Sequence, residues 1–232
     1  MTSSQQLSVA EELVLLCWHD EKGKPVHTST FRMLLAGALV IDLALAELVS
    51  VDDGALVAAD GASASDALHA DLLDRIRRDD KPRKVSKWMH RWSSDKALRQ
   101  AVFERLVQRG VLRAEEQRVL GLFAVTRHPV ADLELAQSVR QRVGAVLVAE
   151  EDPTPRDAAI AGLAATAGAP LVKQLVDKPH RKDALKRGKR LAKEGVSADV
   201  ADAVQQAQAA AMAAVTAAAA ASAASSSSSS GS

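Results

Sequence analysis

Apolar residues recur with the period of an α-helix along most of this chain, and short polar or glycine-containing segments separate the runs. Ser8 followed by Glu11 is the pattern of a capping box, and it predicts a short amphipathic helix that extends to about Trp18. Apolar positions are densest from Thr30 to Val49, so this second helix is expected to be buried on most of its faces. It is therefore the predicted centre of the core.

Two short stretches depart from the helical period. Ala55–Ala59 is predicted to be one short strand, and the alternating segment Arg118–Val125, closed by Thr126–Pro129, is predicted to form a β-hairpin with a basic rim. Gly110 ends the helix before this hairpin. Further helices are predicted over about 65–78, 85–92, 96–110, 132–148, 155–175 and 198–217. We thus expect a mainly α fold, a compact single-domain helical bundle with a protruding β-hairpin and one short additional strand.

The length of 232 residues suits one domain of ordinary size with a full core. We expect a flexible N-terminus over 1–6, one helical domain over 7–217, and a disordered Ala/Ser tail over 218–232. The tail contains the polar run Ser225–Ser230, which has no apolar surface to bury.

Charge is balanced over the whole chain, with 30 Lys and Arg against 29 Asp and Glu. Any electrostatic function must therefore come from how the charges are distributed. The single cysteine, Cys17, lies in an apolar run and is expected to be a buried structural thiol, which suits a reducing cytoplasm. The sequence shows no secretory signal and no apolar window of the roughly 18 residues needed to cross a bilayer. We expect a soluble, cytoplasmic protein that meets a membrane from the side.

Patterns of catalysis are absent from the sequence. No Gly-rich phosphate loop is found, and no histidine pairs at i, i+4 with another histidine or with cysteine. We therefore expect no enzymatic activity, no cofactor and no metal. Asp42 lies within the apolar core helix, and its expected role is to cap a neighbouring helix or to pair with an arginine. The histidines are His19, His27, His69, His90, His128 and His180.

Basic residues are concentrated in two segments. Arg75–Arg99 contains ten Lys or Arg against three Asp, and Lys173–Lys193 contains nine against two. Trp88 and Trp92 lie at i, i+4 within the first segment, so both indoles face one side. Either they rest at the interface of an anionic membrane, or they belong to the core. The second segment is either another contact for an acidic surface or a solvated helix face.

Lys96 and Arg99 are the most specific candidates for binding an anion. They share a helix face at i, i+3, where an arginine fork and a lysine point charge can hold one phosphate. Arg91 and Arg127 are expected to assist. At the hairpin tip, Leu122 and Phe123 either insert into a membrane or partner groove, or fold back into the core.

The order of these motifs resembles the Golgi phosphoprotein 3 family, in a bacterial, actinobacterial-like form. The resemblance runs from about Leu13 to Ala214. Five segments carry it in order: Leu13–Leu16, Leu35–Leu45, Asp66–Leu73, Glu104–Leu112 and Leu122–Pro129.

This resemblance implies a peripheral membrane protein. Eukaryotic members of the family bind phosphatidylinositol 4-phosphate and act as adaptors for the cytoplasmic tails of glycosyltransferases. Two basic residues of the family's headgroup pocket correspond to Lys96 and Arg99, whereas a Trp and an Arg of that pocket are replaced by His27 and Ala36. The expected partners are an acidic phospholipid, phosphoinositide or other, and the cytoplasmic tails of membrane proteins.

A winged-helix DNA-binding unit is the alternative. In it, Lys96–Arg109 is the recognition helix and Arg118–Arg127 the wing, with Lys96, Arg99, Arg105 and Arg127 on phosphates. The balanced charge of the chain and the acidic residues in these two elements disfavour binding to a polyanion. The favoured prediction is therefore non-enzymatic binding of anionic lipid, with no nucleic acid.

Overall fold

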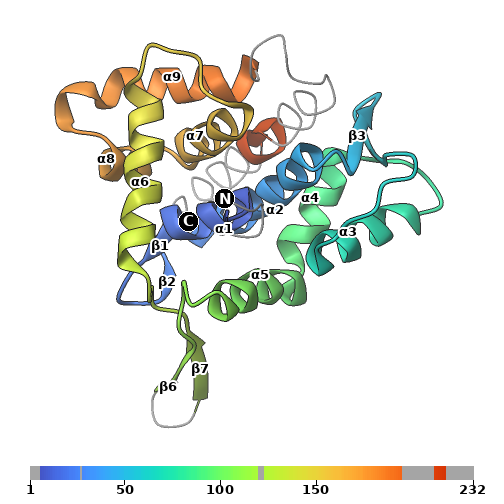
Figure 1. Ribbon diagram of the computed structural model, residues 1–232, viewed down its shortest axis with the longest axis horizontal. Coiled ribbons are helices and arrows are strands. Elements are labelled where there is room, and N and C mark those ends of the chain that lie inside the picture. The colour runs from blue at the N-terminus through green and yellow to red at the C-terminus, as the bar shows by residue number, and fades with distance from the viewer. Residues whose placement is uncertain (1–5, 27, 120–122, 195–211, 218–232) are drawn as a thin grey trace, which may run out of the picture.

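Two helices, α1 (Val9–Cys17) and α2 (Thr28–Leu45), lie at the centre of the computed structural model (Figure 1). The structure describes residues 6–26, 28–119, 123–194 and 212–217. One group of helices, α6–α9, lies on one side of the central pair, and α3–α5 lie on the other (Figure 1). These outer helices are α3 (Ala67–Arg77), α4 (Val85–Ser94), α5 (Lys96–Gln108), α6 (Leu133–Val148), α7 (Pro155–Ala167), α8 (Ala169–Leu175) and α9 (Arg181–Glu194). A 3-10 turn, η2 (Lys178–His180), precedes α9, and 212–217 are helical.

The start of α1 is tied to the C-terminal end of α2. Ser8 and Glu11 form the predicted capping box. The Asp42 carboxylate accepts hydrogen bonds from the backbone N–H of Val9 (2.7 Å) and of Ala10 (3.0 Å), so its predicted capping role is confirmed. Burial raises the pKa of Asp42, and these two hydrogen bonds act against that rise.

Every residue of α1 is buried, including two glutamates, so the prediction of an amphipathic helix is wrong. Glu11 is 1% exposed and Glu12 is 3% exposed. Neither carboxylate is left unpaired, because arginines from three outer helices reach them. The ion pairs are Glu11 with Arg105 of α5 (3.4 Å) and with Arg109 directly after α5 (3.0 Å), and Glu12 with Arg142 of α6 (2.7 Å) and Arg156 of α7 (3.1 Å).

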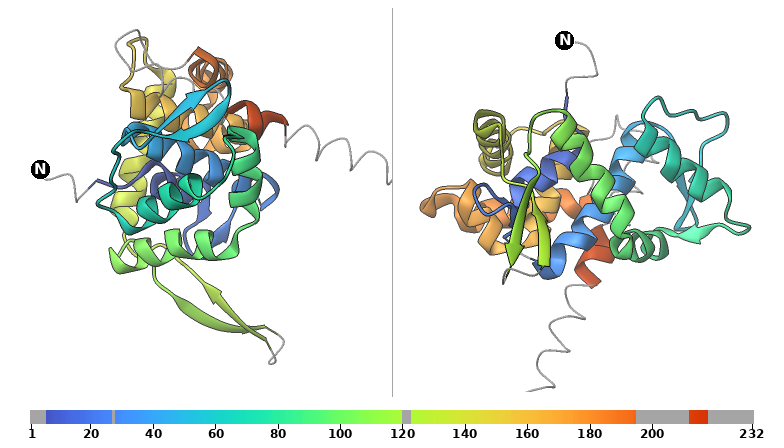
Figure 2. Two further views of the ribbon diagram at one scale, coloured as in Figure 1. Left: turned by 90° about the vertical axis from the view of Figure 1, so that its right-hand side faces the viewer. Right: turned by 90° about the horizontal axis from the view of Figure 1, so that it is seen from below.

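The predicted hairpin is present and protrudes from the helices (Figure 2). Its antiparallel strands are β6 (Glu115–Val119) and β7 (Phe123–Arg127), with Glu115 opposite Arg127. The alternating segment predicted as one unit is thus divided between two strands. Most of α2–α9 follows the predicted helices, and the mainly α fold is confirmed, although Gly168 divides the helix expected over 155–175 into α7 and α8.

The single additional strand that we predicted is part of a three-stranded antiparallel sheet. The strands are β3 (Val49–Asp52), β4 (Ala55–Ala58) and β5 (Arg83–Lys84), in that order. The helix predicted to reach Val49 ends at Leu45, because Glu47 has a φ of 55° that an α-helix cannot contain. The next residues are then free to pair with Ala55–Ala58.

The base of the hairpin is held by the end of α1 and the turn that follows it. Strand β1 (Trp18–His19) pairs with β2 (Lys24–Pro25), and the indole N–H of Trp18 donates to the carbonyl oxygen of His128 (2.7 Å). The His128 imidazole stacks on Phe103, with ring centroids 5.0 Å apart. Cys17 is buried in the same region, as predicted, and burial raises the pKa of its thiol to about 12.

The buried imidazole of His128 makes stability depend on pH. Burial lowers its pKa below the usual 6.5, and the charge of Glu104 opposes this. The unfolded chain therefore binds a proton near pH 6.5 that the folded chain does not bind, so the free energy of unfolding falls as pH drops through 6.5.

We expect the free energy of unfolding, measured by urea denaturation, to fall more between pH 8 and pH 5.5 for wild type than for His128→Phe. The difference in slope is limited to about 1.4 kcal/mol per pH unit for one proton. Equal pH dependence in the two proteins would contradict this assignment.

Candidate functional site

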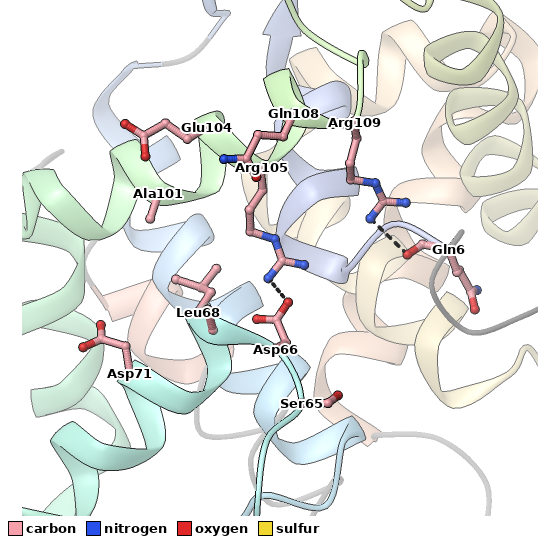
Figure 3. Close-up of a pocket in the computed structure, with 11 residues that line it drawn as sticks. Gln6, Ser65, Asp66, Leu68, Asp71, Ala101, Glu104, Arg105, Gln108 and Arg109 are labelled. Atoms are coloured by element: carbon pink, nitrogen blue, oxygen red, sulfur yellow. Dashed lines mark hydrogen bonds and ion pairs between the residues drawn. The ribbon is translucent and has the colours of Figure 1, made fainter.

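A hollow of about 820 Å³ lies between α3 and α5 (Figure 3). Its arginines are engaged within the protein: Arg105 pairs with Asp66 and Glu11, and Arg109 pairs with Glu11 and donates to the carbonyl oxygen of Gln6 (3.3 Å). None of the residues predicted to bind lipid lines this hollow. It is a junction that holds α1, α3 and α5 together. The pairing of Arg105 also counts against its predicted DNA-phosphate contact in a winged helix.

The predicted pair Lys96 and Arg99 lies on the first turn of α5. Asp95 caps this helix by accepting a hydrogen bond from the backbone N–H of Leu98 (2.9 Å). The same carboxylate pairs with Arg75 (2.6 Å), so the nearest acidic group is already engaged by another cation. Lys96 is exposed and Arg99 is half-buried. This turn therefore presents two positive charges close to solvent.

Arg99 lines a narrow depression between α5, α4 and α2. The opposite cation is Arg32, an exposed residue of α2 that our sequence analysis missed. Arg32 is one helical turn before Ala36, which also lines the depression. The sequence did contain one signal for Arg32, since it is an arginine four residues before Ala36. Only the packing of α5 near α2, however, shows that Arg32 lies beside Arg99. The remaining lining residues are Leu35, Leu39, Trp92, Ser93 and Leu98.

The depression is electrostatically unbalanced. Desolvation by burial and the charge of Arg32 both lower the pKa of Arg99, and only Asp95 acts in the other direction. Among the described residues, the ion pairs include none that involves Arg32, Lys96 or Arg99. An anion that approaches these cations from outside would therefore break no ion pair of the described residues.

The structure places Arg91 in a different hollow. Its guanidinium pairs with Asp79 (3.5 Å) and lies over the Trp88 ring at 5.5 Å. Arg75, Arg78 and Arg83 line this second hollow, which measures about 340 Å³. Arg91 therefore does not join Lys96 and Arg99 at the depression, and its auxiliary role stays a prediction.

Arg127 lies at the base of the hairpin. It is the last residue of β7, and its guanidinium donates to the carbonyl oxygen of Lys22 (3.4 Å). The other predicted contacts cannot be placed: His27 and Leu122 lie outside the described residues, and only the backbone of Phe123 is described. Their contacts with lipid stay predictions.

Trp88 and Trp92 belong to the core, so our first interpretation, that they rest at a membrane interface, is wrong. They are 1% and 3% exposed, and their ring centroids are 5.5 Å apart. The face of α4 that carries them packs against α2. The basic residues on the other faces of α4 gave no information about where the indoles point.

Two further features concern the described part of the chain. Its His, Cys, Asp and Glu side chains form no group of three that could hold a metal ion. Its helices include none that is both long enough and apolar enough to cross a membrane.

Fold and site together define a mainly α-helical domain with a projecting β-hairpin and a cationic depression beside the helix that precedes it. A sequence model of Golgi phosphoprotein 3 (GPP34) matches residues 9–218, so the chain belongs to this family. It is also 26% identical over 170 residues to vacuolar protein sorting-associated protein 74 of Eremothecium gossypii. That match covers 63% of this chain and 51% of the relative, so the chain spans about half the relative's length. The bacterial origin implied by the resemblance stays a prediction.

Proposed function

We propose that this protein docks reversibly on anionic membrane lipid through the exposed first turn of α5, and that it catalyses no reaction. Lys96 and Arg99 contact lipid phosphate, with Arg127 and the hairpin as further contacts. In this role the protein is peripheral to the membrane, on its cytoplasmic side, and acts as an adaptor for the tails of membrane proteins. Membership of the Golgi phosphoprotein 3 family supports the proposal.

The observation that carries the proposal is that Lys96 and Arg99 form no ion pair with any carboxylate of the residues that the structure describes. Arginines elsewhere in the described chain, such as Arg105 and Arg142, are held by carboxylates. Lys96 and Arg99 are on the same turn, near solvent, and the adjacent Asp95 is occupied by Arg75. An unneutralised pair of cations attracts the phosphates of an anionic surface.

We expect Lys96→Gln/Arg99→Gln to bind acidic vesicles about 30-fold more weakly than wild type. Each basic residue near an anionic membrane contributes about 1 kcal/mol, so removing two costs about 2 kcal/mol. Binding is measured by co-sedimentation with neutral vesicles and with vesicles that contain phosphatidylglycerol, cardiolipin or phosphatidylinositol 4-phosphate. Wild-type binding should weaken with added salt, because salt screens exposed charges.

The matched control is Lys182→Gln/Lys189→Gln on α9. These lysines are exposed, and α9 lies at the opposite end of the molecule from α5 and the hairpin (Figure 1). The control removes the same charge and should bind acidic vesicles like wild type. Equal losses of vesicle binding in both double variants would contradict a site at Lys96 and Arg99 and would indicate a diffuse electrostatic attraction. Tight binding of random duplex DNA without lipid binding would favour the winged-helix alternative.

A further inference from the structure

The second basic segment of the sequence forms an exposed face on α9. Lys182, Lys186 and Lys189 are exposed and recur at i, i+4 and i+7, so they lie along one side of this helix. The opposite side carries the buried residues Ala184 and Leu191, and α9 packs against α7. We call the three exposed residues the lysine stripe. The packing of α9 fixes the side of the molecule to which the stripe is presented.

The arginines of α9 stabilise the fold, whereas the lysine stripe does not. The guanidinium groups of Arg181 and Arg187 donate to backbone carbonyl oxygens near the ends of α8 and α6. Among the described residues, the stripe forms one ion pair, a contact of 3.9 Å between the exposed side chains of Lys186 and Asp183. The charges of the stripe are therefore accessible to a partner.

Helix stability does not explain a stripe of one charge sign. Like charges at i, i+3 and i, i+4 destabilise a helix, and a solvated face ordinarily carries both signs interspersed. Helix α3 shows the ordinary arrangement, since Arg75 and Arg78 each pair with an aspartate four residues earlier. On α9 the residues at this spacing are Lys182 and Lys186, which repel one another. A bound anion would relieve this repulsion.

The position of α9 separates the stripe from the surface proposed to bind lipid. Helix α9 lies at the opposite end of the molecule from α5 and the hairpin (Figure 1). A membrane bound at the first turn of α5 would leave the lysine stripe in the aqueous phase. The stripe is therefore suited to a soluble anionic partner, and neither interaction requires the other.

An acidic loop beside α9 limits the length of that anion. Glu150, Glu151 and Asp152 are exposed and consecutive in the loop between α6 and α7. The carbonyl oxygen of Glu151 accepts a hydrogen bond from Arg187 of α9, so the loop lies alongside the helix. These carboxylates repel a long polyanion or a flat anionic surface that extends beyond the stripe. The stripe itself rises by about 10 Å, which about four residues of an extended chain cover.

The chemistry of this face favours an acidic peptide over a nucleic acid. From Ala169 to Glu194 the sequence contains no Trp, Tyr or Phe, so no aromatic ring is present on which a base could stack. Lysine ammonium groups are point charges with three donors, which suits the carboxylates of a segment without fixed geometry. The balanced charge of the chain, 30 cationic against 29 acidic residues, gives little attraction for a polyanion as long as a nucleic acid.

We infer that the lysine stripe of α9 binds a short acidic segment of a partner protein, one that carries several aspartates or glutamates in succession. The ammonium groups pair with its carboxylates, and the exposed Lys173 and Lys178 extend the positive charge toward α8. Exposed ion pairs are individually weak and are screened by salt, so this binding is reversible and depends on salt concentration. The inference goes beyond lipid docking and uses none of the residues assigned to it.

The test measures the fluorescence anisotropy of a labelled oligoglutamate peptide, with the corresponding oligoglutamine peptide as a blank. Wild type should bind oligoglutamate and not oligoglutamine, and its affinity should fall with added salt. Lys182→Gln/Lys189→Gln should bind oligoglutamate about fivefold more weakly, because it removes two charges of the stripe. Glutamine has a helix propensity close to that of lysine, and circular dichroism checks that the variant is folded.

The matched control is Lys81→Gln/Lys87→Gln. Both lysines are exposed, and α4, which contains Lys87, lies on the other side of the central helices from α9 (Figure 1). The control removes the same amount of charge and should bind oligoglutamate like wild type. If both double variants lose affinity equally, only the total charge matters and the assignment to α9 is overturned.

Three further results would overturn the inference. The first is a wild type that does not bind oligoglutamate. The second is displacement of the peptide by random duplex DNA at lower concentration, with DNA binding lost in Lys182→Gln/Lys189→Gln, which would assign the stripe to nucleic acid. The third is loss of acidic-vesicle binding in this same variant, which would assign the stripe to a membrane. Lipid docking through Lys96 and Arg99 is tested with vesicles alone, so its failure would leave the peptide result unchanged.

Discussion

Arg142→Ala/Arg156→Ala is expected to lower the free energy of unfolding by about 3–5 kcal/mol, because it leaves a buried carboxylate without a cation. Glu12 is 3% exposed, and these two arginines reach the same oxygen of its carboxylate at 2.7 Å and 3.1 Å. They come from α6 and α7, so the loss also weakens the attachment of that side of the molecule to α1. Urea denaturation followed by circular dichroism measures the change.

The matched control for this prediction is Glu12→Gln. That variant removes the buried charge and leaves the arginines with other partners, since Arg142 also pairs with Asp157 and Arg156 donates to the carbonyl oxygen of Leu7. Glu12→Gln should therefore lower the free energy of unfolding by less than Arg142→Ala/Arg156→Ala does. Adding Glu12→Gln to Arg142→Ala/Arg156→Ala should recover part of the lost stability. If the triple variant is less stable than the double, the unpaired charge is not the cause.

Asp42→Ala is expected to cost about 2–5 kcal/mol of unfolding free energy. Its carboxylate accepts the hydrogen bonds of two backbone N–H groups, those of Val9 and Ala10, and both residues are fully buried. Alanine would leave two buried donors unpaired at the start of α1, each at a cost of about 1–2.5 kcal/mol, within the range for an unsatisfied buried group. The measurement is again the urea-unfolding free energy, with far-UV circular dichroism as a check on helix content.

Two variants make the Asp42 prediction specific. Asp42→Asn retains one carbonyl oxygen to accept a hydrogen bond, so its loss should lie between those of wild type and Asp42→Ala. Asp183→Ala removes an exposed carboxylate from α9 and should change stability by less than about 0.5 kcal/mol. Similar losses from Asp42→Asn and Asp42→Ala would show that both acceptor oxygens are required.

The elements that stabilise the fold also position the candidate site. Helix α2 caps α1 through Asp42 and carries Arg32 near its other end. Helix α5 is fastened to α1 by Arg105 and Arg109 and carries Arg99 in its first turns. Since both helices are anchored to the same buried helix, Arg32 and Arg99 are held opposite one another. We therefore expect site variants to change lipid binding with little change in stability.

Only part of the candidate site could be predicted from the sequence. Lys96 and Arg99 are one turn apart on a helix, and their shared face follows from the helical period alone. Arg32 is distant in sequence, and its proximity to Arg99 depends on how α2 and α5 pack. The sequence also could not separate Arg99 from Arg105, since both are arginines on one helix. Only the structure shows that Glu11 and Asp66 bind Arg105 and that no carboxylate of the described chain forms an ion pair with Arg99.

The mainly α class, the positions of most helices, the capping box at Ser8 and the hairpin before α6 could all be predicted from the sequence. These features depend on interactions between residues a few positions apart, which periodicity and capping patterns record. The packing of the helices sets the burial of α1 on all its faces, the placement of Trp88 and Trp92 in the core, and the exposure of Arg32. The reason is physical: burial of an indole or a carboxylate depends on which surface packs against it and on whether a partner charge arrives from another helix.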